Sequence, residues 1–422
     1  MKKLYLLLSL IPLFLLLSHS WLGEEVRHVW FAPLNIEFYL KIDRLSMVFL
    51  FLTAIITPIA VLVSRSSHLL ILALEALLIA FFAARDLAFF VFFWEAMLIP
   101  LYFLLLEKGV AMKFLLYMIA GSVLMIAGTL VLYVTTHTFN LDQLAAGTYP
   151  HWIALTFFLA FAVKTPLFPF HGWLPDTYTK ASTGSTILLS TLLSKAGIYG
   201  FLRLGLELFS SSMVLASPWL LALAIAGVFY GALAAWQESD YKRLLAYSSF
   251  SHVNFVLVGV FVANLYAGQG AILQAFNHGI TITALFWVAG LLEKRIGTTH
   301  LGNYGLALAW PRLCWFTLFF VLSSVALPGL NNFVGEILIL LGLLKVNLPL
   351  AALLTTSIIL GAIYMLRFMQ KLYFGPLGAM RGEDIGFKEM ALLFPLVVLI
   401  LLIGLYPQPF LEFIEPILRT SP

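Results

Sequence analysis

The stretch Phe89-Phe-Val-Phe-Phe-Trp-Glu-Ala-Met-Leu-Ile-Pro100 decides the fold class, because it places one carboxylate inside an apolar segment long enough to cross a lipid bilayer. A charge at the centre of a bilayer costs about 2.5 to 3.5 kcal/mol on insertion scales, so an unpaired and idle one is unexpected. We interpret Glu95 as an ionisable group that faces the interior of a helix bundle. A protonated Glu95 that only hydrogen-bonds a neighbouring helix is the alternative.

The composition of the whole chain indicates a membrane protein. Of 422 residues, 62% are hydrophobic and 10% are charged, and the mean hydropathy is +1.00, whereas soluble domains carry about a quarter charged residues. The formal charge of +4 comes without an arginine-rich stripe, so nucleic-acid binding is not indicated. Cys314 is the only cysteine, so any cysteine-ligated redox centre must lie in another chain.

Apolar segments recur along the chain and predict an all-α polytopic membrane protein with about thirteen transmembrane helices. Lys2 and Lys3 precede the first segment and small residues follow it, so a cleaved signal peptide stays open beside the uncleaved helix that we expect. The region 21–43 is expected to be an outer loop. The expected crossings are 3–20, 44–63, 68–84, 87–106, 112–134, 151–180, 183–206, 217–236, 243–263, 267–291, 313–345, 348–371 and 390–411.

The distribution of basic residues predicts the orientation. Of the 24 Lys and Arg residues, 15 fall on the side of the N-terminus and 7 on the other side, and Lys164 and Lys195 fall inside the membrane. Because basic residues concentrate in cytoplasmic loops, we expect a cytoplasmic N-terminus and an outer C-terminus.

Two expected crossings are too long for one straight helix, and each contains a break. The breaks are Lys164-Thr-Pro-Leu-Phe-Pro169 and Leu327-Pro-Gly-Leu-Asn-Asn332. Proline removes a backbone donor, and irregular backbone at membrane depth persists only when it is buried in protein or lines water. A packing kink is the simpler explanation, but a break that coincides with a charge favours an ion site.

The two breaks lie five crossings apart, each in the fourth helix of a five-helix block. A block with an odd number of helices inserts upside down relative to the block before it, so the pattern predicts two inverted repeats with discontinuous helices. The expected divisions are N-terminal helices with an outer loop (1–67), a first repeat (68–206), a second repeat (217–371) and a C-terminal loop, helix and tail (372–422).

Two lysines lie where a bilayer disfavours charge. Lys164 is at the first break, and Lys195 is near the middle of the next crossing. A carboxylate that moves toward or away from a buried lysine changes how tightly the lysine holds its proton. Glu95 and Lys164 are therefore a candidate switch pair.

The second half offers two histidines and a glutamate. His252 and His278 lie in adjacent expected crossings and can pass protons through either ring nitrogen. A single buried histidine is more often structural, whereas two that follow two lysines favour a relay. Glu336 follows the second break, either as a terminal proton acceptor or as a carboxylate near a half-helix N-terminus. The histidines lack close sequence spacing to each other or to a carboxylate, so no metal site is predicted.

His171 and Asp176 follow the first break, in Pro169-Phe-His-Gly-Trp-Leu-Pro-Asp-Thr-Tyr178. Both could line a proton entrance, or they could cap the second half-helix. Lys242 and Arg243 are interpreted as anchors on the positive side of the membrane.

These residues closely resemble the antiporter-like subunits of complex I, which are related to cation/proton antiporter complexes and membrane-bound hydrogenases. The resemblance runs from about Lys41 to Pro409, and a glutamate at 336 resembles the M-type, or chain-4-type, subunit. The motifs that carry it are Phe92-Phe-Trp-Glu-Ala-Met-Leu-Ile-Pro100, Phe161-Ala-Val-Lys-Thr-Pro166, His171-Gly-Trp-Leu-Pro-Asp176, Tyr241-Lys-Arg-Leu-Leu-Ala-Tyr247 and Pro328-Gly-Leu-Asn-Asn-Phe-Val-Gly-Glu336.

The resemblance implies roles for the buried row: Glu95 as switch carboxylate, Lys164 as its partner, Lys195 as central relay lysine, His252 and His278 as relay histidines, and Glu336 as terminal glutamate. It also implies that NADH, flavin, iron-sulfur clusters and quinone bind in partner subunits and that this chain binds no cofactor. Neighbouring antiporter-like subunits in a bacterial inner membrane are the implied partners.

Two features depart from the resembled family. Its members usually have fourteen helices, one more than counted here, and the difference lies near the N-terminus. After Asp176, Thr177-Tyr-Thr-Lys-Ala-Ser182 replaces the usual Ala-His and Ala-Pro pattern, so the entrance is expected to differ.

Three functions follow as hypotheses. The leading one is a proton-translocating subunit of NADH:quinone oxidoreductase, driven by redox chemistry in other subunits. The second is a subunit of a cation/proton antiporter or membrane-bound hydrogenase complex. The third is a scaffold whose buried charges form static ion pairs.

Overall fold

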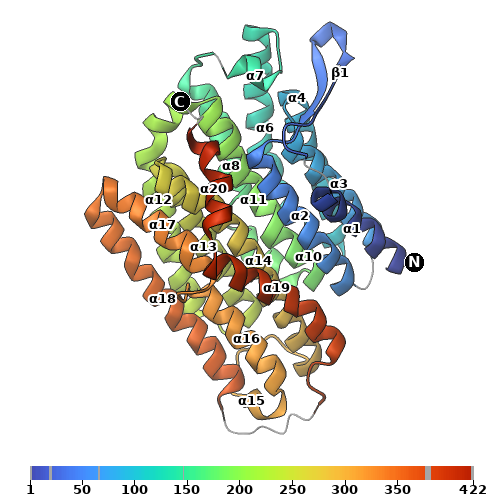
Figure 1. The fold of residues 1–422 in the computed structure, drawn as a ribbon, viewed down its shortest axis with the longest axis vertical. Helices are drawn as coiled ribbons and strands as arrows, with labels where there is room; N and C mark the ends of the chain where they lie inside the picture. The colour runs from blue at the N-terminus through green and yellow to red at the C-terminus, as the bar shows by residue number, and fades with distance from the viewer. Residues whose placement is uncertain (1, 19–20, 65–66, 146, 376–381, 420–422) are drawn as a thin grey trace. The chain divides into compact units, whose positions relative to one another are not determined.

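The computed structural model describes residues 2–18, 21–64, 67–145, 147–375 and 382–419, and most of them are helical (Figure 1). The chain divides into two compact units, Met1–Leu221 with Pro416–Pro422 and Ala222–Glu415. The boundary between them falls inside helix α12 (Ser210–Gln237).

The first unit combines one hairpin with helices that are interrupted at several points. Its elements are α1 (Lys2–Ser18), β1 (Glu25–Phe31), η1 (Ala32–Leu34), β2 (Ile36–Lys41), α2 (Arg44–Val63), α3 (His68–Ala83), α4 (Leu87–Ala96), α5 (Leu98–Leu106), α6 (Ala111–Thr136), α7 (Leu141–Leu144), α8 (His151–Lys164), α9 (Leu174–Lys180), α10 (Thr183–Leu188), η2 (Leu189–Leu193), α11 (Ser194–Gly200) and η3 (Phe201–Gly205).

The second unit is built from long helices and one broken pair. Its elements are α13 (Tyr241–Val262), α14 (Leu265–Ile296), α15 (Leu306–Ala309), α16 (Pro311–Ser324), α17 (Asn331–Val346), α18 (Leu348–Tyr373) and α19 (Phe387–Leu405), and α20 (Gln408–Arg419) crosses the boundary between the units.

Local sequence explains several helix ends. The side chain of Asp43 accepts a hydrogen bond from the Ser46 amide at 2.9 Å and caps α2. Asn264 caps α14 in the same way, through the amide of Ala267 at 3.0 Å. Gly297 ends α14 in the left-handed region, at φ 79°, which glycine adopts without steric cost.

Within the described residues, nine helices are long and apolar enough to cross a membrane, and three shorter apolar helices are His68–Ala83, His151–Lys164 and Pro311–Ser324. The second expected crossing coincides with α2, Arg44–Val63. Both expected breaks are present: α8 ends at Lys164 before α9, and α16 ends at Ser324 before α17.

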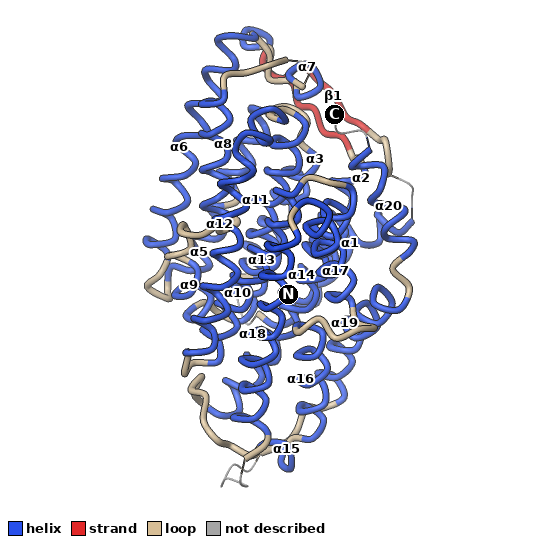
Figure 2. The backbone as a smooth tube through the Cα atoms, turned by 90° about the vertical axis from the view of Figure 1, so that its left-hand side faces the viewer, coloured by secondary structure: helices blue, strands red, loops and turns tan. Residues whose placement is uncertain are grey.

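The region 21–43 is not a loop, and the expectation of an all-α chain is wrong there. Strands β1 and β2 pair antiparallel in a two-stranded hairpin, drawn in red in Figure 2. Every residue of β1 is exposed, so the strand lacks the one-sided apolar alternation by which a strand is recognised. The ion pair between Arg27 and Glu37, at 2.8 Å, joins the two strands instead.

The last expected crossing, 390–411, is also corrected. Helix α19 ends at Leu405, and the separate helix α20 begins at Gln408. Pro407 lies between them and has no amide hydrogen with which to continue α19.

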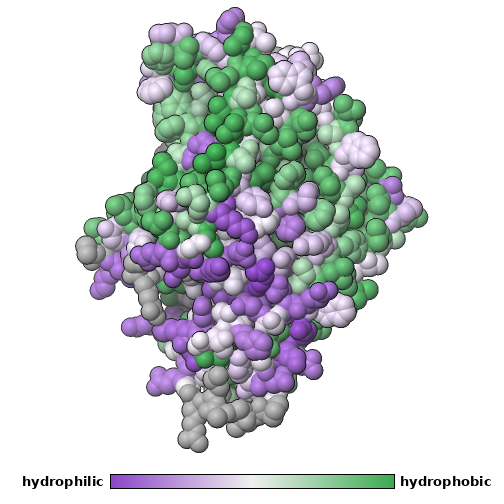
Figure 3. All heavy atoms as spheres, turned by 180° about the vertical axis from the view of Figure 1, so that it is seen from behind, coloured by the Kyte–Doolittle hydropathy of each residue, from purple (hydrophilic) through white to green (hydrophobic). Residues whose placement is uncertain are grey.

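Apolar side chains cover much of the surface, as on the face shown in Figure 3, where they lie beside an area of hydrophilic side chains. On α6, Leu116, Val123, Leu130 and Val134 are 55 to 69% exposed. Their spacing places them along one side of the helix. Such a surface suits contact with lipid rather than water.

Candidate functional site

Lys164 lies at the C-terminal end of α8, where the helix stops before Pro166. Its side chain is 1% exposed. The ammonium donates to the Trp94 carbonyl at 2.8 Å and lies 3.7 Å from the centroid of the Trp94 ring. The lysine is thus held against the residue that precedes Glu95.

Glu95 lies near the end of α4, one residue before the helix is interrupted at Met97. Its Oε1 is buried and has no hydrogen-bond partner among the residues that the structure describes. Because Lys164 binds the carbonyl of Trp94, the carboxylate is left next to the lysine rather than fixed to it.

Lys195 belongs to α11 and is 1% exposed. Its ammonium donates to the Ser190 carbonyl at 2.9 Å and to the Ser194 hydroxyl at 3.3 Å. The carbonyl belongs to η2, a segment of π-helix, and such segments are frequent at functional sites.

A close helix contact joins the two lysine sites. A Cβ atom on Gly197 would lie 2.1 Å from Thr165 Oγ1 and 2.8 Å from the Phe161 carbonyl oxygen. Helix α11 can therefore pack on the end of α8 only because residue 197 lacks a side chain. Lys195 precedes this glycine by two residues, and Lys164 precedes Thr165 by one.

The two expected entrance residues lie on the segment that follows Lys164. Asp176, in α9, forms an ion pair with Lys113 of α6 at 2.5 Å, and both side chains are partly exposed. The ring of His171 stacks on Phe168, with centroids 5.7 Å apart. Lys113 was not among the expected residues, although a basic residue near a helix end is readable from the sequence.

In the second unit, three expected residues come together. His252 of α13 contacts Glu336 of α17 through Nδ1 and Oε1 at 3.1 Å. The rings of His252 and His278 lie 5.8 Å apart, and both His278 and Glu336 are 3% exposed. Gln274 of α14, which the sequence analysis missed, donates to the same Glu336 oxygen at 3.2 Å.

Beside this group lies a cavity of about 20 Å³. One water molecule needs about 10 to 15 Å³ by the same measure, so the cavity is large enough to hold one. Polar lining comes from His252 and Glu336 together with Ser251, Ser324, Ser357 and Tyr364. The Tyr364 hydroxyl lies 3.0 Å from the Ser248 hydroxyl.

The break between α16 and α17 is tied to α14 by amide groups. Asn277 Nδ2 donates to the Asn331 carbonyl at 2.7 Å, and Asn331 Nδ2 donates to the Asn277 carbonyl at 3.2 Å. Ser323 also donates to Asn331 Oδ1 at 2.8 Å. These bonds hold the start of α17 in place, and Glu336 lies more than one turn into that helix, beyond a capping position.

The sequence analysis missed Glu75, which lies in the middle of α3 and is 4% exposed. Its Oε1 is buried and lacks a hydrogen-bond partner within the described part of the chain. The signal was available, because a carboxylate inside an apolar crossing is the same signal that identified Glu95.

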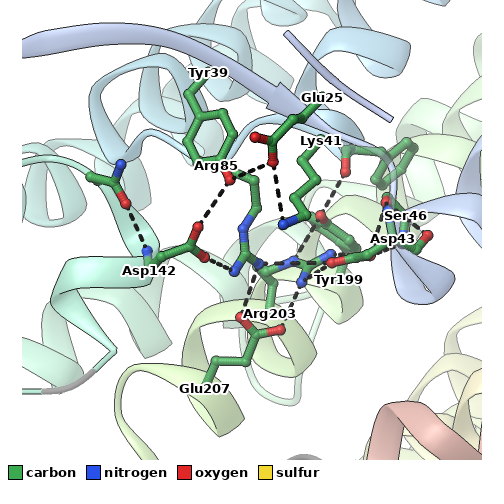
Figure 4. Close-up of polar contacts among 12 residues, drawn as sticks. Glu25, Tyr39, Lys41, Asp43, Ser46, Arg85, Asp142, Tyr199, Arg203 and Glu207 are labelled. Carbon is green, nitrogen blue, oxygen red and sulfur yellow. Dashed lines mark hydrogen bonds and ion pairs between the residues drawn. The ribbon is translucent and has the colours of Figure 1, made fainter. Parts of the chain in front are cut away.

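A network of charged side chains at one end of the first unit was also missed. Figure 4 shows Arg203 between Asp43 and Glu207. The Arg203 guanidinium reaches the two Asp43 oxygens at 2.6 and 2.7 Å, and Glu207 Oε1 at 2.7 Å. Arg85 contacts Glu207 at 3.0 Å and also pairs with Asp142. We call Asp43, Arg85, Asp142, Arg203 and Glu207 the charge cluster.

Two aspartates outside the spans show the electrostatics of this end. Burial alone would raise the pKa of the Asp43 carboxyl, but Arg203 and the Ser46 amide outweigh burial and hold the pKa well below its ordinary value. Burial raises the pKa of Asp86, the N-cap of α4, to about 6, although the amides of Glu37, Ala88 and Phe89 oppose the rise. Two carboxyls near the same membrane edge are thus shifted in opposite directions.

Known proteins are similar to this chain in sequence and in fold. The family model described as NADH:quinone oxidoreductase/Mrp antiporter, TM, matches residues 84–361. NADH-quinone oxidoreductase subunit M of Escherichia coli (strain K12) is 33% identical over 419 residues, which cover 91% of this chain and 82% of that protein.

Two solved structures resemble the chain over its whole length. A chain of respiratory complex I from Thermus thermophilus matches with a TM-score of 0.90 and 32% identity, covering 100% of this chain and 99% of that chain. A chain of the Mrp complex from Dietzia sp. has the same fold, with a TM-score of 0.88 at 22% identity, covering 100% of this chain and 93% of that chain. This chain belongs to the NADH:quinone oxidoreductase/Mrp antiporter transmembrane family.

Proposed function

We propose that this chain is a proton-translocating membrane subunit of an NADH:quinone oxidoreductase. Protons move along Glu95, Lys164, Lys195, His252, His278 and Glu336, and the work comes from quinone reduction in other subunits. The M-type relative supports this assignment over a cation/proton antiporter, because the Mrp likeness at 22% identity concerns the fold alone.

The observation that carries the proposal is the group formed by His252, His278 and Glu336, with a cavity of water size that His252 and Glu336 line. Three titratable side chains from three helices would not converge in a membrane interior for packing alone, since each is costly to bury there. Histidine beside a carboxylate can accept a proton on one ring nitrogen and release one from the other.

The two lysines supply the first half of the path. Lys164 and Lys195 are bound to backbone carbonyls, which accept hydrogen bonds but do not neutralise an ammonium charge. Lys164 therefore depends on a mobile carboxylate or on a transferred proton for its charge balance. Glu95 is the switch carboxylate for Lys164, and Glu336 is the last acceptor of the row.

The proton enters near Asp176, Lys113 and His171, on the segment between α8 and α9. The Asp176–Lys113 ion pair is partly exposed, so water reaches it, and Lys164 is the nearest member of the row along the chain. Opening of this pair would give protons access to the break.

The finer topology is part of the same proposal. The chain crosses a bacterial inner membrane thirteen times, with a cytoplasmic N-terminus and an outer C-terminus, and the segments 68–206 and 217–371 are inverted repeats. NADH, flavin, iron-sulfur clusters and quinone bind in partner subunits, and neighbouring antiporter-like subunits flank this chain. Redox chemistry in this chain is not required.

The test is the composition and activity of the native complex after detergent extraction. Co-purification with flavin, iron-sulfur and quinone-site subunits, together with NADH-driven proton uptake into vesicles, is the expected result. Co-purification with hydrophobic antiporter-like chains only, with sodium-dependent proton exchange in vesicles that lack NADH and quinone, would replace the proposal with the antiporter function.

A further inference from the structure

One face of the helix Thr183–Gly205 carries polar residues at four-residue intervals, which place them on the same side. They are Lys195, Tyr199 and Arg203, and Glu207 continues the series just beyond the helix. Eight residues separate Lys195 from Arg203, about 12 Å along an α-helix. This column connects the middle of the membrane to the charge cluster, and it resembles a proton exit.

The contacts of Tyr199 argue against an exit. Its hydroxyl donates to the Phe82 carbonyl at 2.6 Å and accepts from Arg203 Nε at 2.9 Å, so both of its roles are taken. The tyrosine is fully buried, and its ring lies 5.1 to 5.5 Å from the rings of Phe49, Phe81 and Phe82. The rings of Phe49, Phe81 and Phe82 therefore surround Tyr199, the one residue of the column that carries a hydroxyl, with apolar atoms.

Arg203 blocks the column in a second way. Its side chain is 2% exposed, and both Asp43 and Glu207 bind it. A guanidinium keeps its proton under all ordinary conditions, so it cannot accept a proton from Tyr199 and pass it on.

Lys195 itself is directed away from this end. Its ammonium binds the carbonyl of Ser190 and the hydroxyl of Ser194, which lie on the opposite side of Lys195 from Tyr199 along the helix. These two hydrogen bonds of the lysine lead away from the column.

We propose that Tyr199 and Arg203, held by Asp43 and Glu207, form a seal that prevents protons on Lys195 from leaving at the hairpin end of the first unit. The inference rests on the proposed function, since it assigns a use to protons carried by Lys195. Without the seal, a proton would cross the membrane within the first unit, and this leak would dissipate the proton gradient that the driving reaction builds.

The test measures passive proton leak in sealed vesicles that contain the whole complex and no NADH. A pH step is imposed, and its decay is followed with an internal pH dye and normalised to assembled complex. The main variant is the double substitution Asp43→Asn with Arg203→Gln, which removes both charges and keeps side chains of similar size. Arg27→Gln, which removes an arginine from an exposed ion pair of the hairpin, is the control.

We expect the double variant to leak roughly tenfold faster, the change that follows when about 1.4 kcal/mol of barrier is removed. Arg27→Gln should keep the leak of the parent, and Lys195→Ala added to the double variant should restore it. A double variant with the parent's leak, or a leak that survives Lys195→Ala, would overturn the seal.

If the double variant does not assemble, Tyr199→Leu provides the same test, because it removes the hydroxyl and leaves the Arg203–Asp43 pair intact. A leak equal to that of the parent again overturns the seal. The proposed function is tested by a different measurement, NADH-driven proton uptake in the parent complex. The seal and the proposed function can therefore fail independently of each other.

Discussion

His252 Nδ1 and Glu336 Oε1 lie 3.1 Å apart, although 84 residues separate the two side chains along the chain. The contact joins an imidazole to a buried carboxylate, so one proton can pass between them without backbone movement. It also gives Glu336 a partner on α13 in addition to Gln274 on α14, which fixes the carboxylate between two helices.

Glu336→Gln should abolish the last acceptor while leaving the shape of the site. An amide keeps a hydrogen-bonding oxygen for Gln274 but does not bind or release a proton. We expect proton transfer through this chain to slow by about a hundredfold or more, the usual cost of removing an acid–base group. The measurement is dye quenching in vesicles during NADH oxidation. Glu412→Gln, on the exposed surface of α20, is the control, and equal loss in both variants would contradict the assignment.

The contact between His252 and Glu336 predicts that their substitutions are not additive. His252→Gln and Glu336→Gln each interrupt the same transfer, so the double variant should be little worse than the more damaging single variant. The quantity to compare is the rate of NADH-driven proton uptake per assembled complex in all four proteins. Independent, multiplying effects would show that the two residues lie on separate paths.

Gly197→Ala should displace α11 from α8. The added methyl group would meet Thr165 Oγ1 at 2.1 Å and the backbone nitrogen of Thr165 at 2.9 Å, and the backbone cannot yield as a side chain can. We expect a loss of about 1 to 3 kcal/mol in the free energy of unfolding, together with weaker pumping. Gly386→Ala is the matched control, since nothing lies within 4 Å of the added atom. Thermal denaturation of the purified complex compares the two, and an equal melting temperature would disprove the close contact.

The raised pKa of the Asp86 carboxyl predicts that the stability of the folded protein depends on pH. Burial raises its pKa from 3.8 to about 6, with Glu37 nearby as a further contribution in the same direction. Because the folded pKa is the higher one, the stabilisation is fully present below about pH 3.8 and is lost as the pH rises through about 6. The amount lost is on the order of 3 kcal/mol.

Asp86→Asn should therefore flatten the decline in melting temperature between pH 5 and pH 7 and still cap α4, since asparagine is as good an N-cap. A parent slope that survives Asp86→Asn would assign the dependence to other groups.

Much of the fold follows from the sequence, because the membrane imposes the length of apolar segments and the cost of charge. That rule located α2, the two proline breaks and each buried residue of the proposed row. It would also have located Glu75, had it been applied to every crossing. The β1–β2 hairpin was missed because every residue of β1 is exposed, so that strand buries no face and leaves no periodic signal.

The contacts within the candidate site could not be predicted from sequence. The meeting of His252 with Glu336, and of Arg203 with Asp43 across 160 residues, depends on which helices pack together. Arg203 was counted among residues outside the membrane because it lies near the end of a crossing. Its burial follows from the cap of α2, which brings Asp43 to the same point.

The most direct test of the buried row is the number of protons taken up per NADH oxidised by the reconstituted complex with Lys195→Ala. Lys180→Ala, which changes an exposed lysine of α9, is the control for assembly and for loss of positive charge. The account predicts a lower ratio for Lys195→Ala and the parent's ratio for Lys180→Ala. An assembled Lys195→Ala complex that keeps the full ratio would contradict the central claim and favour static ion pairs as the role of the buried charges.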